Sequence, residues 1–561
     1  MRRSVLLVIL FLIALSIAPA QESSYSLPKK ASLALNGLSA ERMRADLKFL
    51  SSDLLEGRGT GQRGGELAAS YIATQFELAG LKPGAPDGTY FQKVPLMGIS
   101  TVAEGTSLKL EGPKGSVPLK YLDDYVAWSR TEEKVTDQSS DLIFVGYGIV
   151  APEFQWDDYK GVDVKGKTLL MLVNDPPSTD TKLFGGPALT YYGRWTYKFE
   201  MGTRKEANGV ILIHTTPSAG YGFNVVQNSW SKEQPFVGRA KGERVLSLES
   251  WITEAKAKEL FTLAGKNLDE AREAAARRDF RPIPLGITVT SHIVSNVRPV
   301  ETANVLGVLE GGDPQKKTEA VVFSAHYDHL GIGKEENGDK IFNGAVDNAS
   351  GVSILLDLAR VYAGAAEGGT RPPRSILFIA AAAEEGGLRG SQYYATHPTF
   401  PPGKIAANLN IDGIQVVGPA LEYTFLGSEK TTLGPIISWA ERQFGFKNVP
   451  DPEPGQGSYY RSDHFNFAKV GVPSVSIDQG DKFEGKDPAL GKKIWEDYNE
   501  NRYHRPSDEY DASWDFSGLV KLGRIAGSIG WVVASQPKLQ SWKPGDEFLA
   551  AREASWRAGS Q

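Results

Sequence analysis

Three short apolar runs in the second half of the chain each end in side chains that can bind a metal ion. The run "AVVFSAH" ends at His326, "SILFIAAAAEE" ends at Glu384 and Glu385, and "ANLNID" ends at Asp412. Apolar runs of this length are typical of strands that are buried on both faces of a sheet. Because helical patterns separate the runs, the sequence predicts an α/β fold, with a mixed sheet covered by helices on both faces.

The ends of these strands are expected to lie together. In an open α/β sheet, the carboxyl ends of the strands line one crevice, even when their residues are far apart in the chain. Two further segments can supply side chains to such a crevice: Asp347 lies in a turn before a helical stretch, and His504 lies in the loop "YHRPSDEY". We therefore place the candidate active site in this crevice.

The residue types at these positions indicate a metal site. Two adjacent carboxylates at the edge of a core are costly unless cations neutralise them. Zinc suits a set of histidines and carboxylates, and two ions about 3.5–4 Å apart can share one carboxylate. The candidate ligands for two Zn²⁺ ions are His326, Asp347, Glu385, Asp412 and His504. Glu384 is then left over as a candidate general base.

The composition excludes several other kinds of site and partner. The chain of 561 residues has no cysteine, so it can form no disulfide and can offer no thiolate to a metal or a substrate. Its net charge of -5 and its scattered charges give no sign of a nucleic-acid surface. The stretch from Gly59 to Gly64 matches a dinucleotide-binding pattern, but the residues before it do not read as a strand, and we expect no bound nucleotide. A peptide or another small solute is the expected partner.

The first twenty residues have the features of a secretory signal peptide. Arg2 and Arg3 precede an apolar stretch, and Ala18-Pro19-Ala20 provides a small-residue cleavage site. The apolar stretch is short for a membrane span, although an uncleaved anchor is the alternative. We therefore expect a protein that is exported to the periplasm or secreted, with no stable membrane insertion after cleavage.

The remaining pattern divides the chain into zones. After the signal peptide (1–20), residues 21–136 are expected to form the N-terminal part of the main domain. Residues 137–284 combine short strands and turns with a charged helical connection, and are predicted to be an inserted, β-rich domain. Residues 285–540 alternate strands with helices and form the main part of the predicted catalytic domain. Residues 541–561 are interpreted as a C-terminal tail.

Five motifs in a fixed order resemble those of the co-catalytic dizinc aminopeptidases, a family that includes glutamate carboxypeptidase and the transferrin receptor ectodomain. The motifs are "SAHYDHLG", "GAVDNASG", "AAEEGGLRGS", "NLNIDG" and "YHRPSDEY". The N-terminal segment "LLEGRGTGQRGGELAASYIATQFELAGLKPG" is similar to the same family. Residues 137 to about 252 resemble the protease-associated domain inserted in many members. The resemblance implies a fold of the zinc exopeptidase type.

The resemblance also implies a role for each residue of the site. His326 and Asp412 would hold one zinc ion, Glu385 and His504 the other, and Asp347 would bridge them. Asp328 would orient the imidazole of His326, and Glu384 would take the proton from the attacking water. Tyr459 would help to stabilise the oxyanion, with Tyr460 as the alternative. Of the remaining residues, His329, Asp463 and His464 are left open as neighbours of the site, Asp508 is interpreted as orienting nearby backbone, and His214, His292 and His397 are interpreted as structural.

These features predict an exported zinc aminopeptidase that acts on peptides. One alternative is a related enzyme, either a carboxypeptidase acting on acidic dipeptides or a glutaminyl cyclase that uses one zinc ion. A non-catalytic binding ectodomain is the third possibility, although no predicted ligand is missing. Cobalt or manganese in place of zinc is left open, as is a homodimer. The inserted domain can restrict access, bind substrate or mediate dimerisation.

Overall fold

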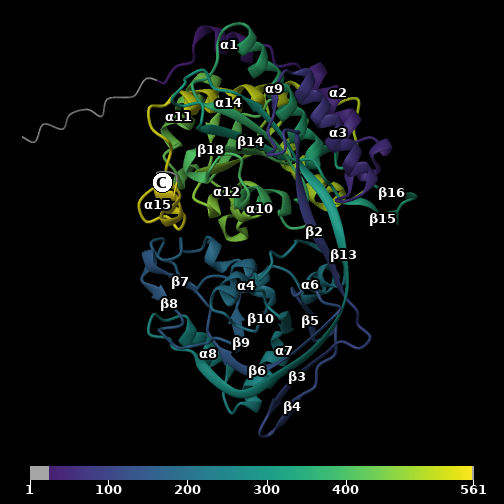
Figure 1. The fold of residues 1–561 in the computed structure, drawn as a ribbon, viewed down its shortest axis with the longest axis vertical. Helices are drawn as coiled ribbons and strands as arrows, with labels where there is room; N and C mark the ends of the chain where they lie inside the picture. The colour runs from purple at the N-terminus through teal and green to yellow at the C-terminus, as the bar shows by residue number, and fades with distance from the viewer. Residues whose placement is uncertain (1–24, 559–561) are drawn as a thin grey trace, which may run out of the picture.

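The computed structural model describes residues 25–558, and the predicted signal peptide lies outside these residues. Figure 1 shows an upper and a lower lobe, with the long strand β13 (Ile283–Leu309) and strand β2 (Phe91–Thr101) running from one lobe to the other. The two lobes therefore share continuous strands as well as contacts between side chains.

The upper lobe is built on a mixed sheet, as the sequence predicts. Four parallel strands form its centre, and antiparallel strands extend it on both sides. The order across the sheet is β11 (Gln234–Val237), β2, β13, β17 (Ser375–Ala381), β14 (Ala320–His326), β18 (Ile405–Ile411), β21 (Ser474–Gln479), β19 (Glu422–Leu426) and β20 (Lys447–Asn448). The two-residue strand β1 (Lys82–Pro83) pairs with the end of β13. Every residue of β14, β17 and β18 is buried, which explains their almost wholly apolar sequences.

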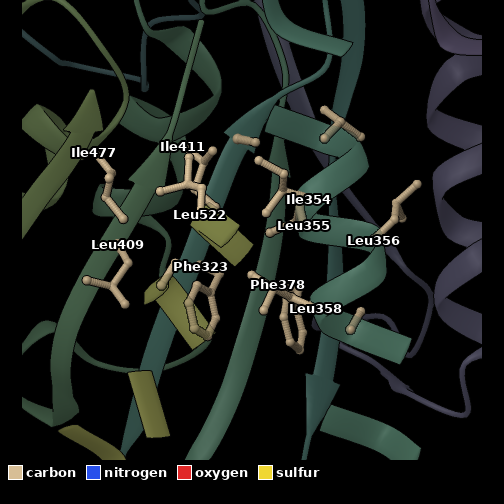
Figure 2. Packing of buried hydrophobic residues seen from close by; sticks show 14 of the residues in the cluster. Phe323, Ile354, Leu355, Leu356, Leu358, Phe378, Leu409, Ile411, Ile477 and Leu522 are labelled. Carbon is tan, nitrogen blue, oxygen red and sulfur yellow. The ribbon is translucent and has the colours of Figure 1, made fainter. Parts of the chain in front are cut away.

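Helices cover both faces of this sheet. One face packs against α1 (Lys29–Leu35), α2 (Ala40–Leu50), α3 (Arg63–Leu78), α9 (Ser350–Glu367), α11 (Gly434–Phe444) and α14 (Ser517–Ser535). The other face packs against α10 (Arg389–Thr396) and α12 (His464–Lys469). Figure 2 shows the first of these layers, where Phe323 and Phe378 on adjacent strands stack with ring centroids 5.6 Å apart and lie close to side chains of α9. Burial of this layer supplies the apolar driving force that holds the strand ends in register.

One helical segment among the described residues, Ala345–Glu367, is long and apolar enough to cross a membrane by length and composition. Within the most apolar part of this segment, 83% of the residues are buried inside the protein. Buried core helices commonly pass such a test, and the packing of α9 against the sheet accounts for its composition.

The lower lobe has a second sheet and its own core. The sheet contains β3 (Ser107–Gly112), the first half of β13, β6 (Val135–Phe144), β9 (Thr168–Leu172), β10 (Gly209–His214), β12 (Leu248–Thr253) and β5 (Tyr125–Trp128), and β4 (Gly115–Val117) pairs with β3. It is accompanied by α4 (Trp195–Arg204), α6 (Phe223–Trp230), α7 (Glu254–Leu263) and α8 (Leu268–Ala275). Its identity as a protease-associated domain stays a prediction.

The structure divides the chain at positions that differ from the predicted ones. The lower lobe takes in β3 to β5, which precede the predicted start at residue 137. Strand β13 crosses the predicted boundary between residues 284 and 285, pairing first with β6 and β3 and then with β2 and β17. A single strand that serves two sheets carries no turn or composition change to mark the boundary.

The segment interpreted as a tail is packed against the upper lobe over its described part. It contains α15 (Leu549–Ala558), and the side chains of Trp542 and Arg552 are buried. The Arg552 guanidinium donates to the backbone carbonyls of Pro402 and Ile405 at 2.8 and 2.9 Å.

Candidate metal centre and active-site cavity

The ends of the parallel strands bring the candidate ligands together. His326 is the last residue of β14, and Asp412 directly follows β18. Glu384 and Glu385 come a few residues after β17, in a tight turn closed by the N–H of Gly387, which donates to the carbonyl of Glu384 at 2.8 Å. This edge of the sheet therefore presents the imidazole and the carboxylates to one side of the upper lobe.

Asp347 lies between the two candidate metal positions. Its Oδ1 is 3.1 Å from Nε2 of His326, and its Oδ2 is 3.3 Å from Nε2 of His504. Asp412 Oδ1 is 3.0 Å from the same His326 nitrogen, and Glu385 Oε2 is 3.1 Å from that of His504. The structure thus brings all five predicted ligands together, with one oxygen of Asp347 on each side.

The loop that carries Asp347 is fixed by a second carboxylate. Asp508 accepts the backbone N–H of Val346 through Oδ1 and that of Asp347 through Oδ2, each at 3.0 Å. Asp508 is 1% exposed, so these hydrogen bonds are shielded from water. Asp508 therefore lies where it orients the backbone of the candidate bridging residue, and its two oxygens are already occupied.

The charge balance of the cluster favours bound cations. Burial lowers the pKa of His326, but the carboxylates of Asp412 and Glu384 outweigh it and raise that pKa well above the usual value. Burial also lowers the pKa of His504, but hydrogen bonds to Asp347 and Glu385 raise it to about 10. Both shifts have the same physical cause, an excess of negative charge in a buried space. Zinc fits this set, because it takes neutral imidazole and carboxylate ligands and neutralises buried negative charge.

Glu384 differs from the ligand carboxylates around it. Its side chain lines the same cavity, and its carboxylate makes no hydrogen bond to any described residue. Burial, followed by the nearby Asp412 and Glu385, raises the pKa of Glu384 well above the usual value. A free carboxylate with raised proton affinity beside a candidate metal site has the properties of a general base.

Asp328 touches both the histidine ligand and the candidate base. The Nδ1 of His326 is 3.2 Å from the backbone carbonyl of Asp328, whereas the Asp328 carboxylate is 3.9 Å from it. Because a carbonyl can only accept, Nδ1 carries the hydrogen and Nε2 is directed at the carboxylates. The Asp328 side chain instead accepts the N–H of Glu384 at 3.0 Å and the hydroxyl of Thr60 at 3.0 Å.

The predicted tyrosine lies away from this cluster. The hydroxyl of Tyr459 donates to the backbone carbonyl of Ser474 at 3.1 Å, and its side chain is absent from the cavity wall that the described residues form. Tyr460 lines the cavity, but its hydroxyl donates to Glu547 at 2.7 Å and accepts from Lys430 at 2.9 Å. Neither hydroxyl is directed at the ligands in this structure.

Three residues that the sequence left open or missed are part of the site. Nδ1 of His329 is 2.7 Å from Oε1 of Glu385, while His504 lies 3.1 Å from the other oxygen of that carboxylate. Tyr503 stacks on His504 with ring centroids 3.8 Å apart. The hydroxyl of Tyr498 is buried, has no partner among the described residues, and belongs to a side chain that lines the cavity. His329 and Tyr503 could have been found from the sequence, because each lies within three residues of a predicted ligand.

The N-terminal segment reaches the site as well. Arg58 is 1% exposed and donates to the backbone carbonyls of Tyr327, Asn343 and Gly344 at 2.7, 2.6 and 2.8 Å. These carbonyls belong to the two loops that carry His326 and Asp347. Arg58 therefore ties both loops together, which gives a physical reason for the family resemblance of this segment.

The cluster opens into a cavity of about 1790 Å³ that both lobes line. The upper lobe contributes His326, Asp347, Glu384, Glu385 and Asp412, and the lower lobe contributes aromatic and basic side chains, including Trp128, Trp195 and Arg194. The lobes are joined beside it by an ion pair of 2.6 Å between Glu200 and Lys469. A cavity of this size can enclose a peptide of a few residues.

A family model matches the part of the chain that carries the cluster. Residues 304–527 match peptidase family M28. This part of the chain is therefore similar to the peptidases of family M28. The matched residues include every candidate ligand and Glu384, while Arg58 and most of the lower lobe lie outside them.

Curated relatives are similar over shorter stretches. A probable zinc metalloprotease of Pyricularia oryzae is 36% identical over 117 residues, which are 21% of this chain and 20% of the relative. Aminopeptidase YwaD of Bacillus subtilis is 28% identical over 185 residues, 32% of this chain and 36% of the relative. The alignments thus span well under two thirds of these relatives. Among solved structures, an aminopeptidase from Aneurinibacillus sp. strain AM-1 is 18% identical, with a TM-score of 0.46, and the match covers 91% of this chain and 97% of that one.

Proposed function

We propose that this protein is an exported zinc aminopeptidase, which removes N-terminal residues from peptides. The observation that supports this most strongly is the position of Asp347, whose two carboxylate oxygens each face a different histidine. The candidate ligand groups His326/Asp347/Asp412 and His329/Asp347/Glu385 share this residue, as two metal ions with one bridging carboxylate require. The second group contains His329, but His504 Nε2 also lies 3.3 Å from Asp347 and 3.1 Å from Glu385, and we assign the ligand role to His504. Export rests on the predicted signal peptide, and the aminopeptidase activity on the similarity to peptidase family M28 and to the named relatives.

The proposed mechanism assigns distinct tasks to the side chains of the cavity. His326 and Asp412 would hold one zinc ion, Glu385 and His504 the second, and Asp347 both. Bound zinc supplies Lewis-acid chemistry, which makes water more acidic and polarises the scissile carbonyl. Glu384 accepts the proton of the attacking water and returns it to the leaving amine, a contribution of roughly 10²–10⁴-fold. The raised pKa of Glu384 favours its uptake of the proton from water, and the protonated side chain can then donate that proton to the leaving amine.

The cavity also offers a place for the free α-amine of a substrate. Asp478 lines the cavity, and burial followed by the carboxylates of Asp412 and Asp451 raises its pKa to about 7. An ammonium group beside these carboxylates would relieve their repulsion. This acidic part of the cavity, Asp451 and Asp478, therefore supports an exopeptidase that recognises the N-terminus.

One observation favours a second candidate, a carboxypeptidase of the glutamate carboxypeptidase type. Arg194 lines the cavity, its Nε is buried, and this atom has no hydrogen-bond partner among residues 25–558. Its neighbour Arg461 lowers the pKa of Arg194 further after burial, which brings that pKa to about 10. A cationic group of this kind could hold the C-terminal residue of a blocked dipeptide next to the metal site.

Metal analysis and two matched substrates test the proposal. We expect two zinc ions per purified chain, and hydrolysis of leucine p-nitroanilide but not of its N-acetylated form. Glu384→Gln should keep both zinc ions while kcat falls by roughly 10²–10⁴-fold. Hydrolysis of N-acetylated substrates alone would favour the carboxypeptidase, and a fully active Glu384→Gln variant would overturn the assignment of the base.

A further inference from the structure

A second group of charged side chains lies on the wall where the two lobes meet. Arg130 follows β5 of the lower lobe, and Arg389 begins α10, in the turn after Glu384. The guanidinium carbons of Arg130 and Arg389 lie 3.7 and 4.8 Å from the ring centroid of Phe236. All three side chains line the cavity. Arg130 and Arg389, here called the arginine pair, thus bring two positive charges to one aromatic ring.

The arginine pair has little direct contact with carboxylates of the protein. Glu249 is the one carboxylate within 4.0 Å of either guanidinium among residues 25–558, and its Oε1 is 3.9 Å from Arg130. The other oxygen of Glu249 already accepts the indole N–H of Trp128 at 2.7 Å. Within the described part of the chain, Arg389 donates only to neutral oxygens, those of Pro235, Gly386 and Gln392.

The other acidic side chains nearby are engaged elsewhere. Glu200 forms ion pairs with Lys469 at 2.6 Å and Arg204 at 3.2 Å. Glu132 and Glu243 accept backbone N–H groups, at 2.7 and 2.9 Å, and make no ion pair with the arginine pair. Glu132 and Glu243 therefore keep their negative charge and act on Arg130 from a distance, whereas Arg389 has no carboxylate within 4.0 Å among residues 25–558.

Arg389 is the less well compensated charge of the two. Burial, and then the charge of Arg130, lower the pKa of Arg389 to about 9. Burial also lowers the pKa of Arg130, although Glu249, Glu132 and Glu243 oppose it. Two like charges close together repel each other, and an anion bound close to both would relieve this repulsion. Planar guanidinium groups suit a carboxylate in particular, because they can donate two parallel hydrogen bonds to it.

We propose that Arg130 and Arg389 form a subsite for a carboxylate of the peptide substrate. The subsite rests on the proposed peptidase function, and it defines the preferred substrates as short peptides that carry a negative charge beyond the cleaved bond. Two sources share this chemistry, the C-terminal carboxylate of a short peptide and the side chain of a downstream Asp or Glu. With the acidic part of the cavity (Asp451 and Asp478) taking the ammonium group, the two regions of opposite sign would orient the peptide.

Three matched substrates test the subsite in the zinc-loaded protein. They are Leu-Ala-Ala, its C-terminal amide, and the amide of Leu-Ala-Glu, with leucine release as the readout. We expect kcat/KM for at least one carboxylate-bearing peptide to exceed that of Leu-Ala-Ala amide by roughly ten-fold or more. Preference for the free acid identifies the C-terminal carboxylate, and preference for the glutamyl amide identifies the side chain.

Variants show whether the arginine pair causes the preference. In Arg130→Gln and Arg389→Gln, the ratio of acid to amide kcat/KM should fall at least five-fold, mostly through KM. Arg130→Lys keeps the positive charge but loses the planar guanidinium group. Its acid-to-amide ratio should therefore lie between those of the wild type and Arg130→Gln, and this variant replaces Arg130→Gln in the test if the latter does not fold. Arg239→Gln is the control, because Arg239 is exposed on the same lobe and does not line the cavity; its ratio should stay at the wild-type value.

Several results would overturn the subsite. They are equal rates on all three peptides in the wild type, a ratio that is unchanged in the arginine-pair variants, or a ratio that is lost only in Arg194→Gln. Failure of the proposed function looks different, since the wild type would then release no leucine from any of the three peptides.

Discussion

At the scale of single residues, the five candidate ligands His326, Asp347, Glu385, Asp412 and His504 meet although they come from strand ends and loops that are far apart in the chain. Their mutual distances of 3.0 to 3.3 Å depend on packing that spans the whole upper lobe. The ligands could be chosen from the sequence, because apolar runs and turn motifs mark strand ends and loops. The contact of 2.7 Å between His329 and Glu385 could not be derived, because a loop side chain three residues after His326 can face any of several partners.

His464 shows how a residue near the site can act on stability instead of catalysis. It is fully buried at the start of α12, and neither of its ring nitrogens has a partner among residues 25–558. Burial lowers its pKa from 6.5 to about 3. The imidazole therefore stays neutral in the folded protein at pH values where the unfolded chain is already protonated.

This shift predicts an acid-sensitive contribution to stability. A lowered pKa gives a stability that is complete above pH 6.5 and is lost as the pH falls toward 3. Between pH 7.5 and pH 5, His464 should cost the folded state about 2 kcal/mol. The variant His464→Leu lacks this titrating group, so its loss of stability between the two pH values should be smaller by the same amount. Calorimetry of both proteins at both pH values measures the difference. An equal loss in both would show that His464 does not titrate in this way.

At the scale of elements, the glycines from Gly59 to Gly64 have a packing role. A short 3₁₀ segment, Asp53–Arg58, and not a strand, precedes them, and α3 follows. A Cβ atom on Gly64 would lie 1.8 Å from the backbone oxygen of Leu55. The first turn of α3 must therefore approach this segment closely, and the same segment holds Arg58 in place at the metal-site loops.

We expect Gly64→Ala to disturb this contact. Overpacking against backbone should reduce stability by roughly 1–3 kcal/mol, and the resulting shift of Arg58 should weaken zinc binding. Gly364→Ala is a matched control, because a Cβ there meets no atom within 4 Å and alanine is favoured in a helix, so that variant should gain up to about 1 kcal/mol. Thermal unfolding and zinc titration of both variants provide the measurement. Equal stabilities would argue against the close-packing role of Gly64.

The elements themselves were predictable to different degrees. Strands β14, β17 and β18 follow directly from their apolar runs, because burial on both faces leaves a clear sequence signal. Strand β13 could not be predicted at its full length, since it alternates buried and exposed residues in one lobe and is buried in the other. Its continuity depends on two sheets that form only when the whole chain has folded.

At the scale of the whole molecule, β13 and β2 physically couple the lobes. An apolar cluster adds to this coupling, because the core of the lower lobe includes Tyr459, Tyr460, Phe465 and Phe548 of the upper lobe. The candidate ligands all lie on the upper lobe, yet the cavity beside them is closed by side chains of the lower lobe. The inserted lobe is therefore in a position to limit the size of the substrates that reach the site.

This coupling makes metal removal a test of the whole structure. Zinc bound only by the folded state stabilises it by about 4 kcal/mol when free zinc is 1,000-fold above the dissociation constant. Chelation should therefore lower the unfolding temperature and leave the buried carboxylates of the site without compensating cations. Because the lobes share strands and an apolar cluster, we expect calorimetry to show a single unfolding transition. Chelation should lower the temperature of this transition, and added zinc should restore it.

A variant provides the control for this measurement. Asp347→Asn removes the shared ligand, so the unfolding temperature of this variant should respond little to chelator or zinc. Two transitions, of which chelation moves only one, would contradict this coupling and would show that the lobes fold independently in spite of the strands that join them.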